Sequence, residues 1–172
     1  MKRLAIIVLI EAILVIAIIV LFATIYGDVF ADEYFIICKP GVYINVRFHP
    51  NKRAEVIGEL ELGDKVESDG KEQNGFIHVT GLSFEFTEGW IYKGLLVKDE
   101  PYICEWGCQI ISDSRVAARH YINGKRKGWI KPGKEVTVYA VSRDWSITEK
   151  GYVQTRFLSV NYPEIQKCQD GD

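Results

Sequence analysis

The sequence contains little that serves catalysis. Its 172 residues include only four cysteines and three histidines, and neither a Gly-x-Ser-x-Gly motif nor a phosphate-binding glycine loop occurs. A cysteine nucleophile requires a partner histidine on a larger fold, and the main order available is Cys38 with His49 or His78. The chain lacks the length and the helical segment on which such a nucleophile normally lies. We therefore expect no enzymatic activity, no catalytic residue and no cofactor.

One long hydrophobic run is present, at the N-terminus. Residues 4–26 contain a single charge, Glu11, and as a helix they would measure roughly 35 Å, enough to cross a bilayer. Lys2 and Arg3 precede the run, which by the positive-inside rule directs the remainder of the chain out of the cytoplasm. We predict that residues 1–31 are a single-pass transmembrane anchor. The alternative is a signal peptide cleaved after Ala31, which would leave a secreted protein.

The four cysteines all follow this run. In a small exported protein an even number of cysteines is typical of disulfides, so Cys38, Cys104, Cys108 and Cys168 are disulfide candidates. Three connectivities are open, and we favour Cys38 with Cys104 and Cys108 with Cys168. Cys104, Cys108 and His120 also supply three metal ligands, but no matching fourth ligand follows, and we expect no metal site.

Opposite charges divide the rest of the chain. Residues 32–101 carry 8 Lys and Arg against 13 Asp and Glu, a net charge of −5, and residues 102–160 carry 10 against 5, a net charge of +5. Three readings are open: the segments attract each other, the basic segment faces an anionic partner such as wall polymer or lipid headgroups, or the charges are evenly solvated. Nucleic acid is not expected, because the topology is external and no extended basic and aromatic surface occurs.

A sequence pattern occurs twice behind the hydrophobic run. Each copy has an arginine after a short apolar segment, then a glycine turn, then a glycine followed by a large aromatic residue. In the first copy these are Arg47, Gly63 and Gly89-Trp90, and in the second they are Arg119, Gly133 and Gly151-Tyr152. A period of about 60–70 residues predicts two domains, residues 32–101 and 102–160, followed by a tail at 161–172.

Both copies have the composition of β-strands. Segments rich in β-branched and aromatic residues are typical of strands, and they occur at residues 42–46, 77–79, 90–91, 136–141, 145–148 and 152–153. Turn sequences separate them: Gly63-Asp64, Asn74-Gly75, Asn123-Gly124 and Pro132-Gly133. Short strands with glycine turns predict an all-β chain of two small barrels. Because only residues 98–101 separate the copies, we expect the barrels to touch.

The first copy resembles the bacterial SH3-like domain family. The residues that carry the resemblance are Asn45-Val46-Arg47, Ile57-Gly58, Gly63-Asp64-Lys65-Val66, Phe76-x-x-Val79 and Gly89-Trp90-Ile91. The second copy is similar, but it has Ala117-Ala118-Arg119 in place of Asn-Val-Arg and Tyr152 in place of the final tryptophan. The resemblance implies two SH3-like barrels in an exported envelope protein, with cell-wall peptides or proteins as ligands.

Candidate ligand-binding residues lie in the loops and among the aromatic residues of both copies. They are Arg47, Phe48, Tyr92, Arg119, Tyr121, Lys125, Arg126, Lys127 and Tyr152. Exposed aromatic rings suit a peptide groove, and the three consecutive cations at 125–127 form a compact positive patch. Arg47 and Arg119 have a structural alternative as braces that bind backbone carbonyls of the following loop. We expect Trp90, Trp129 and Trp145 to fill the cores.

The function that this pattern favours is non-catalytic binding at the cell envelope. We expect tandem SH3-like domains that recognise peptidoglycan or wall peptides. The alternative is a membrane-anchored adaptor or inhibitor that acts on another envelope protein.

Overall fold

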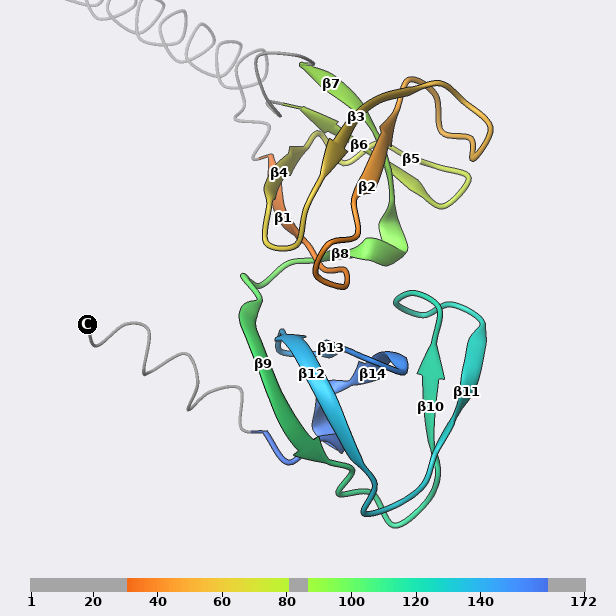
Figure 1. The fold of residues 1–172 in the computed structure, drawn as a ribbon. Helices are drawn as coiled ribbons and strands as arrows, with labels where there is room; N and C mark the ends of the chain where they lie inside the picture. The colour runs from red at the N-terminus through yellow and green to blue at the C-terminus, as the bar shows by residue number, and fades with distance from the viewer. Residues whose placement is uncertain (1–30, 81–86, 161–172) are drawn as a thin grey trace, which may run out of the picture. The chain divides into compact units, whose positions relative to one another are not determined.

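The computed structural model describes residues 31–80 and 87–160 as an all-β chain with two antiparallel sheets (Figure 1). Within these ranges the helical elements are the 3-10 turns η1 (Lys93–Leu95) and η2 (Thr155–Phe157). No helix among the described residues is long and apolar enough to cross a membrane. The predicted anchor or signal segment lies outside the described residues, as does Cys168.

The first sheet contains the strands before residue 98. They are β1 (Asp32–Ile36), β2 (Ile44–Arg47), β3 (Val56–Leu60), β4 (Lys65–Ser68), β5 (Glu72–Gln73), β6 (Phe76–Thr80), β7 (Glu88–Tyr92) and β8 (Leu96–Val97). Their order is β3-β2-β7-β6-β4-β1-β8, and β5 pairs with β6. Alternation along β4 explains which face is buried, since Val66 and Ser68 point inward and Lys65 and Glu67 point to solvent.

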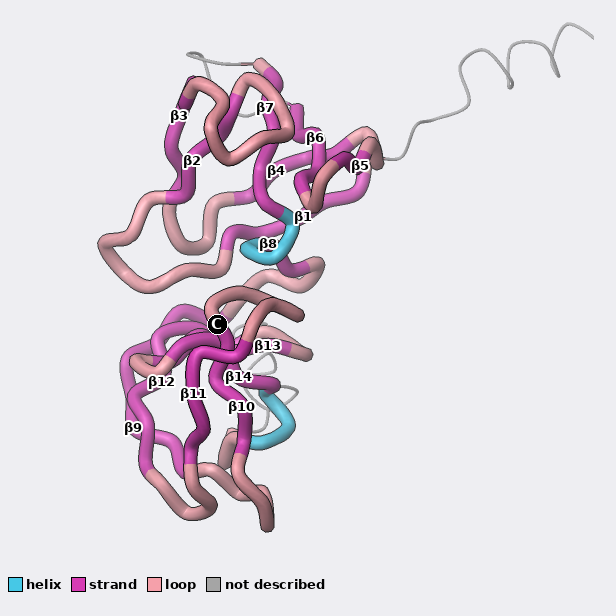
Figure 2. Tube along the Cα trace, turned by 90° about the vertical axis from the view of Figure 1, so that its right-hand side faces the viewer, coloured by secondary structure: helices cyan, strands magenta, loops and turns pink. Residues whose placement is uncertain are grey.

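The second sheet repeats this arrangement. Its strands are β9 (Tyr102–Gln109), β10 (Val116–Arg119), β11 (Arg126–Ile130), β12 (Glu135–Val141), β13 (Trp145–Thr148) and β14 (Gly151–Gln154). The order β11-β10-β14-β13-β12-β9 matches β3-β2-β7-β6-β4-β1 of the first sheet, strand for strand. Figure 2 shows the two groups of strands from a second side. The sequence repeat is therefore also a repeat of strand order.

Equivalent hydrogen bonds fix the register of the two copies. The amide of Gly63 donates to the carbonyl of Ile36 at 2.9 Å, and the amide of Gly133 donates to the carbonyl of Ile110 at 2.8 Å. Both glycines have a positive φ, +91° and +67°, which suits glycine at these turns. The predicted turn at Asn74-Gly75 is likewise confirmed by positive φ angles at both residues. These pairs make Gly63 equivalent to Gly133.

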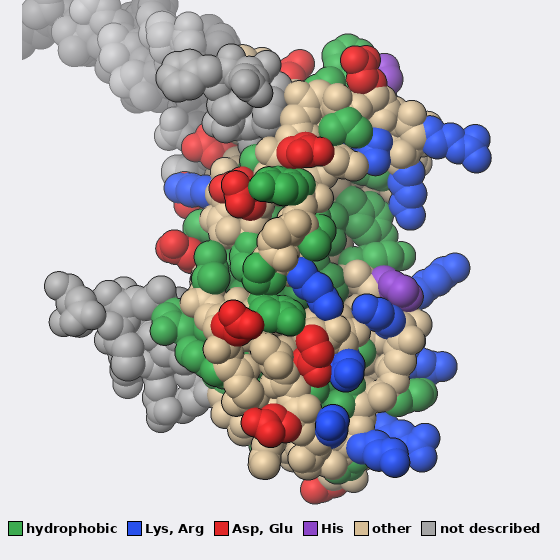
Figure 3. Space-filling model, in the orientation of Figure 1, with side chains coloured by type: hydrophobic (Ala, Val, Ile, Leu, Met, Phe, Trp, Pro, Cys, Tyr) green, Lys and Arg blue, Asp and Glu red, His purple; other side chains and the backbone are tan. Residues whose placement is uncertain are grey.

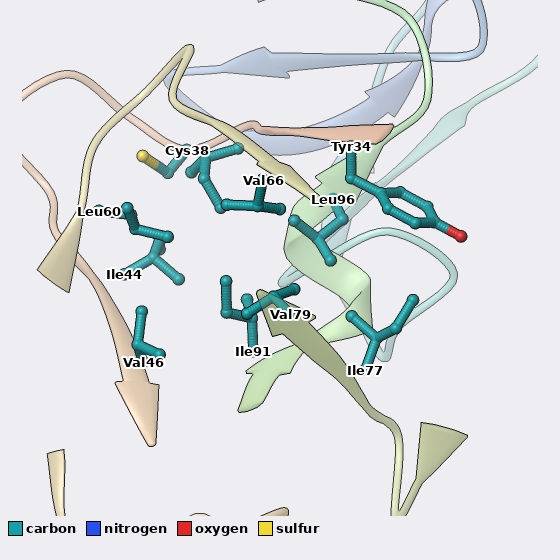
Figure 4. Packing of buried hydrophobic residues seen from close by; sticks show 11 residues of the cluster. Tyr34, Cys38, Ile44, Val46, Leu60, Val66, Ile77, Val79, Ile91 and Leu96 are labelled. Carbon is teal, nitrogen blue, oxygen red and sulfur yellow. The ribbon is translucent and has the colours of Figure 1, made fainter. Parts of the chain in front are cut away.

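Each sheet encloses its own hydrophobic core. In the first core, Ile44, Val46 and Leu60 from one end of the strand order pack with Tyr34 and Val66 from the other end (Figure 4). The sheet must therefore curl around this core. Burying each such aliphatic side chain contributes about 1.5–3 kcal/mol. The second core is built in the same way from Cys108, Ile110, Val116, Ala118, Ile130, Val136, Val138, Val141, Val153 and Leu158.

A third core joins the two copies. Its buried members are Ile37 and Val97 from the first copy and Ala140, Trp145, Ile147 and Tyr152 from the second. All described residues belong to one compact unit that begins at Ala31. The expected contact between the copies is confirmed, because this core removes apolar side chains of both from solvent.

The tryptophans divide between core and surface. Trp145 is 8% exposed, as expected, whereas Trp90 is half-buried with its ring 5.0 Å from that of His78. The prediction that Trp129 is a core residue is wrong, since 53% of Trp129 is exposed. The physical reason is alternation along β11: Ile130 enters the core, so its neighbour Trp129 points outward.

The structure also differs from the expected disulfides. Cys38, Cys104 and Cys108 carry free thiols, so the favoured bond between Cys38 and Cys104 is not formed. Cys38 packs in the first core, whereas Cys104 lies against the second, with its Sγ 3.7 Å from the carbonyl of Val138. Two thiols in separate cores cannot meet without movement of the backbone.

Candidate functional site

A groove of about 900 Å³ opens where the two copies meet. It is lined mainly by aromatic and charged side chains: Asp32, Tyr34, Glu72, Tyr92, Lys93, Lys98, Asp99, Tyr121, Arg143, Asp144 and Trp145. Two residues that the sequence singled out, Tyr92 and Tyr121, are thus brought together from different copies. A concave site with aromatic walls and a few polar groups is the usual form of a ligand site.

Tyr92 and Tyr121 form the aromatic centre of this groove. Their ring centroids are 4.8 Å apart with planes at 85°, an edge-to-face pair. Tyr92 also meets Phe76 edge-to-face at 5.5 Å. The ammonium of Lys52 lies over the Tyr92 ring, 5.4 Å from its centroid. Contacts on several sides hold both rings in place before any ligand arrives.

Two glycines allow the rings to approach the backbone. A Cβ at Gly94 would lie 2.9 Å from both Tyr121 and Tyr92, and a Cβ at Gly124 would lie 2.2 Å from the Tyr121 ring. The amide of Ile122 donates a hydrogen bond of 2.8 Å to the carbonyl of Gly94, which ties the loop of Tyr121 to the first copy. Side chains at either glycine would displace Tyr121.

The two phenols are electrostatically unequal. Burial and the hydrogen bond with Tyr121 raise the pKa of Tyr92 to about 12. The same hydrogen bond, with the nearby cations Lys52 and Lys125, lowers the pKa of Tyr121. A hydrogen bond between the two phenols thus accompanies their edge-to-face ring contact.

Charges in the groove are arranged as neighbouring pairs of opposite sign. Lys98 Nζ lies 3.1 Å from an oxygen of Asp32, and Arg143 lies 3.2 Å from Asp99. Lys93 pairs with Glu72. The carboxylate of Asp144, a further lining residue, makes no ion pair with the described residues. Such a lining offers partners both to the amino groups and to the carboxylates of a ligand.

Covalent chemistry has no obvious nucleophile among the described lining residues. None of them is cysteine or histidine, and the hydroxyl of Ser142 is engaged as a donor to the carbonyl of Trp145 at 2.8 Å. Elsewhere in the described ranges, no group of three His, Cys, Asp or Glu side chains is placed to hold a metal ion.

Arg47 and Arg119 occupy equivalent places and act as braces. Arg47 Nη1 donates to the carbonyl of Ala54 at 2.7 Å, and Arg119 Nη1 donates to the carbonyl of Gly124 at 2.7 Å. Each arginine thus fixes the loop that follows its strand, as the structural alternative predicted. In the second copy that loop carries Tyr121, so Arg119 contributes to the groove through the loop rather than by lining it.

The remaining candidate residues lie outside the groove. Phe48 is 58% exposed and contacts His49 edge-to-face at 4.6 Å. Tyr152 is buried, and its hydroxyl donates to the carbonyl of Ile37 at 2.6 Å. Lys125, Arg126 and Lys127 are all exposed on the second copy. In Figure 3, Lys and Arg side chains gather along the right-hand edge of the molecule, where Figure 1 shows β10 and β11 in the second copy.

Some lining residues were missed by sequence reasoning. Asp32, Lys98 and Arg143 are ordinary charged residues in a sequence where about a quarter of residues are charged, so nothing in their pattern indicates a groove. Outside the groove, Lys127, Trp129 and Lys131 follow a two-residue alternation along β11 and just after it, a pattern that predicts one shared face of a strand.

The described thiols are poor nucleophiles. Burial is the main cause that raises the pKa of Cys38 to about 11 and that of Cys104 to about 12. Burial also raises the pKa of Cys108, although the indole of Trp106, which donates to its sulfur at 2.9 Å, opposes this shift. All three therefore behave as core residues.

Comparisons with known proteins give distant similarities. No protein-family model matches this sequence, and no curated protein matches it. Two solved structures from Trichomonas vaginalis, NlpC1 and NlpC2, align with 76% of this chain at 18% and 16% sequence identity, each with a TM-score of 0.32. The aligned part spans 46% of the NlpC1 chain and 48% of the NlpC2 chain, so this chain corresponds to about half the length of either.

Proposed function

We propose that this chain is a non-catalytic binding protein of the bacterial cell envelope, in which two tandem SH3-like barrels recognise a short cell-wall peptide. The groove between the two copies is the proposed binding site, and residues 1–31 are the proposed membrane anchor or signal segment. The repeated motifs and the matching strand orders support the SH3-like assignment.

The observation that carries the proposal is the composition of the groove. A free short peptide has an amino group, a carboxylate and few large side chains. Charges of both signs can pair with its two ends, and aromatic walls provide the apolar contacts that its small side chains cannot make with one another. Tyr92 and Tyr121 supply rigid walls, while Asp144 and the pair of Arg143 with Asp99 supply both signs nearby. Because these residues come from both copies, the tandem arrangement is needed for the site.

Binding to purified sacculi tests this proposal. The full chain, in a neutral detergent, should sediment with sacculi, and Tyr121→Ala should remain in the supernatant. Tyr43→Ala is the matched control, because Tyr43 is 55% exposed and lies outside the groove lining. Equal sedimentation of all three proteins, or of none, would contradict wall-peptide binding at this groove.

An adaptor or inhibitor of another envelope protein is the second candidate. It is favoured by exposed apolar side chains of the first copy: Val42, Tyr43, Phe48 and Val56, each between 43% and 58% exposed. Exposed apolar side chains of this kind are common in protein interfaces. This candidate predicts that Tyr43→Ala, rather than Tyr121→Ala, abolishes co-purification of a partner protein.

A further inference from the structure

A second hollow lies on the second sheet beside β11 and shares no lining residue with the groove. Its volume is about 440 Å³, and it is lined by Ala118, Lys127, Gly128, Trp129, Ile130, Lys131, Lys134, Glu149 and Lys150. We call this hollow the Trp129 pocket. Its size is that of a site for a small molecule or for one unit of a polymer.

The positive charge of the Trp129 pocket is not balanced within the protein. Lys127, Lys131 and Lys134 make no ion pair with the described residues. The single acid, Glu149, is occupied by the amide of Thr137, which donates to it at 2.6 Å, and by Lys150 at 3.7 Å. Four lysines around one engaged carboxylate create a cationic field that attracts anions.

Lysines without an ion-pair partner are not general in this chain, as the first sheet shows. Lys65, Lys71, Lys93 and Lys98 all belong to the first copy, and each forms an ion pair with a carboxylate. These four lysines are thus neutralised by nearby carboxylates. Lys127, Lys131 and Lys134 of the Trp129 pocket are available to a partner.

Trp129 gives the pocket an aromatic wall. The indole is 53% exposed, and the guanidinium of Arg126 lies 4.4 Å from its ring centroid. Beside it, a Cβ added at Gly128 would meet nothing within 4 Å, so the floor of the pocket is open. A flat apolar ring next to several cations fits a ligand with a carbon skeleton and anionic groups.

The equivalent surface of the first copy has the opposite character. Matching registers place Glu59 where the second copy has Trp129, since Glu59 pairs with Asn45 and Trp129 with Ala117. Counting on from there, Glu61 corresponds to Lys131 and Asp64 to Lys134, in agreement with the equivalent turns at Gly63 and Gly133. The aromatic and cationic lining of the pocket is therefore particular to the second copy and is not required by the fold.

We infer that the Trp129 pocket binds a phosphate-bearing sugar or polyol unit of an anionic polymer. The lysines would pair with phosphate oxygens, and the indole would pack against the carbon skeleton of the unit. One unit of a polymer fits into a recessed pocket, whereas a flat membrane surface does not. The shape of the pocket therefore favours a polymer over a bilayer. This inference is independent of peptide binding in the groove.

Titration calorimetry of the full chain with synthetic glycerol phosphate oligomers tests the inference. The oligomers should bind, with an affinity that falls as salt is raised, and maltohexaose, which is uncharged, should not bind. Replacing pocket residues by their first-copy equivalents, as Trp129→Glu with Lys131→Glu and Lys134→Asp, should lower the affinity by at least about tenfold. These side chains are exposed, so the fold should persist, and circular dichroism checks this.

A matched control separates the pocket from the general charge of the second copy. Arg115→Glu with Arg156→Glu changes the net charge as much as the lysine replacements do, at exposed positions outside the pocket. This control should bind the oligomers as the natural sequence does. An equal loss in both variants, no binding of the oligomers, equal binding of maltohexaose, or binding only to vesicles of phosphatidylglycerol and phosphatidylcholine would each overturn the inference. Because Tyr121→Ala should leave oligomer binding unchanged, failure here is distinguishable from failure of wall-peptide binding.

Discussion

The hydroxyl of Tyr152, in strand β14 of the second copy, donates a hydrogen bond of 2.6 Å to the carbonyl of Ile37 in the first copy. Tyr152 stands where the first copy has Trp90, as their pairing with Arg119 and Arg47 shows. The residue that departs from the repeated motif therefore contributes a link between the copies. The divergence of the second copy at this position has a structural cause.

Tyr152→Phe should weaken the joint between the copies. It keeps the buried ring but removes the hydrogen bond, which is worth about 1 kcal/mol of unfolding free energy. Burial raises the pKa of Tyr152 above its ordinary value of 10.0. The folded state thus favours the protonated phenol, so this stabilisation is complete below pH 10 and is lost as pH rises further.

Urea denaturation at several pH values measures this effect. The natural protein should lose more stability above pH 10 than Tyr152→Phe does. Tyr34 and Tyr92 also have raised pKa values, so a smaller alkaline loss should persist in the variant. Identical pH profiles for the two proteins would show that Tyr152 does not couple the copies in this way.

Gly89→Ala should destabilise the first copy. A Cβ at this position would lie 2.4 Å from Cγ1 of Val46 and 3.3 Å from the carbonyl oxygen of Arg47, so the core must shift, at a cost of about 1–3 kcal/mol. Gly128→Ala is the control, because its added Cβ would meet no atom within 4 Å. Urea midpoints compare the two variants, and a Gly89→Ala protein as stable as Gly128→Ala would refute the close packing.

Arg47→Ala should release the loop that follows β2. Without the bond from Arg47 to the carbonyl of Ala54, the amide of Phe48, which donates to the carbonyl of Glu55 at 3.0 Å, should exchange with solvent about tenfold faster. Hydrogen exchange followed by nuclear magnetic resonance measures this rate. If Arg47 served only to contact a ligand, exchange in the free protein would not change.

The described thiols should resist alkylation. With a pKa near 11 for Cys38 and near 12 for Cys104, the thiolate fraction at pH 7.5 is about a hundredfold or more below that of an ordinary cysteine. Iodoacetamide should therefore label Cys38, Cys104 and Cys108 slowly in the folded protein and rapidly in guanidinium chloride. Peptide mapping by mass spectrometry reads each site, and a linked peptide containing Cys38 and Cys104 would contradict the free thiols.

Local chemistry explains what could be predicted from the sequence. The turn at Asn74-Gly75, the close approach at Gly89 and the loop-bracing arginines follow from backbone sterics and hydrogen-bonding capacity, which depend on few neighbours. Trp129 differs from its predicted place in the core because of its strand. Gly128-Trp129-Ile130 has the same residues as Gly89-Trp90-Ile91, but it lies in β11, which is equivalent to β3 and not to β7, and alternation along β11 places Trp129 outside the core.

The groove could not be predicted, because it depends on how two copies meet. Tyr92 and Tyr121 were recognised as aromatic candidates, but their contact requires the backbone of Gly94 to approach the loop of Ile122. Strand β9 was also missed, although Cys104, Trp106 and Cys108 alternate with exposed residues along it. That alternation indicates a strand, even though its inward residues are cysteine and tryptophan rather than aliphatic residues.

Wall-peptide recognition by the groove is tested most directly by a calorimetric titration of the full chain, in neutral detergent, with soluble peptides released from purified sacculi. Saturable binding is expected, and Tyr121→Ala should weaken it at least about tenfold, equal to about 1.4 kcal/mol of binding free energy. Trp129→Ala should bind the peptides as the natural sequence does, since Trp129 lies outside the groove. No heat of binding with the natural sequence, or the same affinity for Tyr121→Ala, would contradict the proposal that the groove recognises wall peptides.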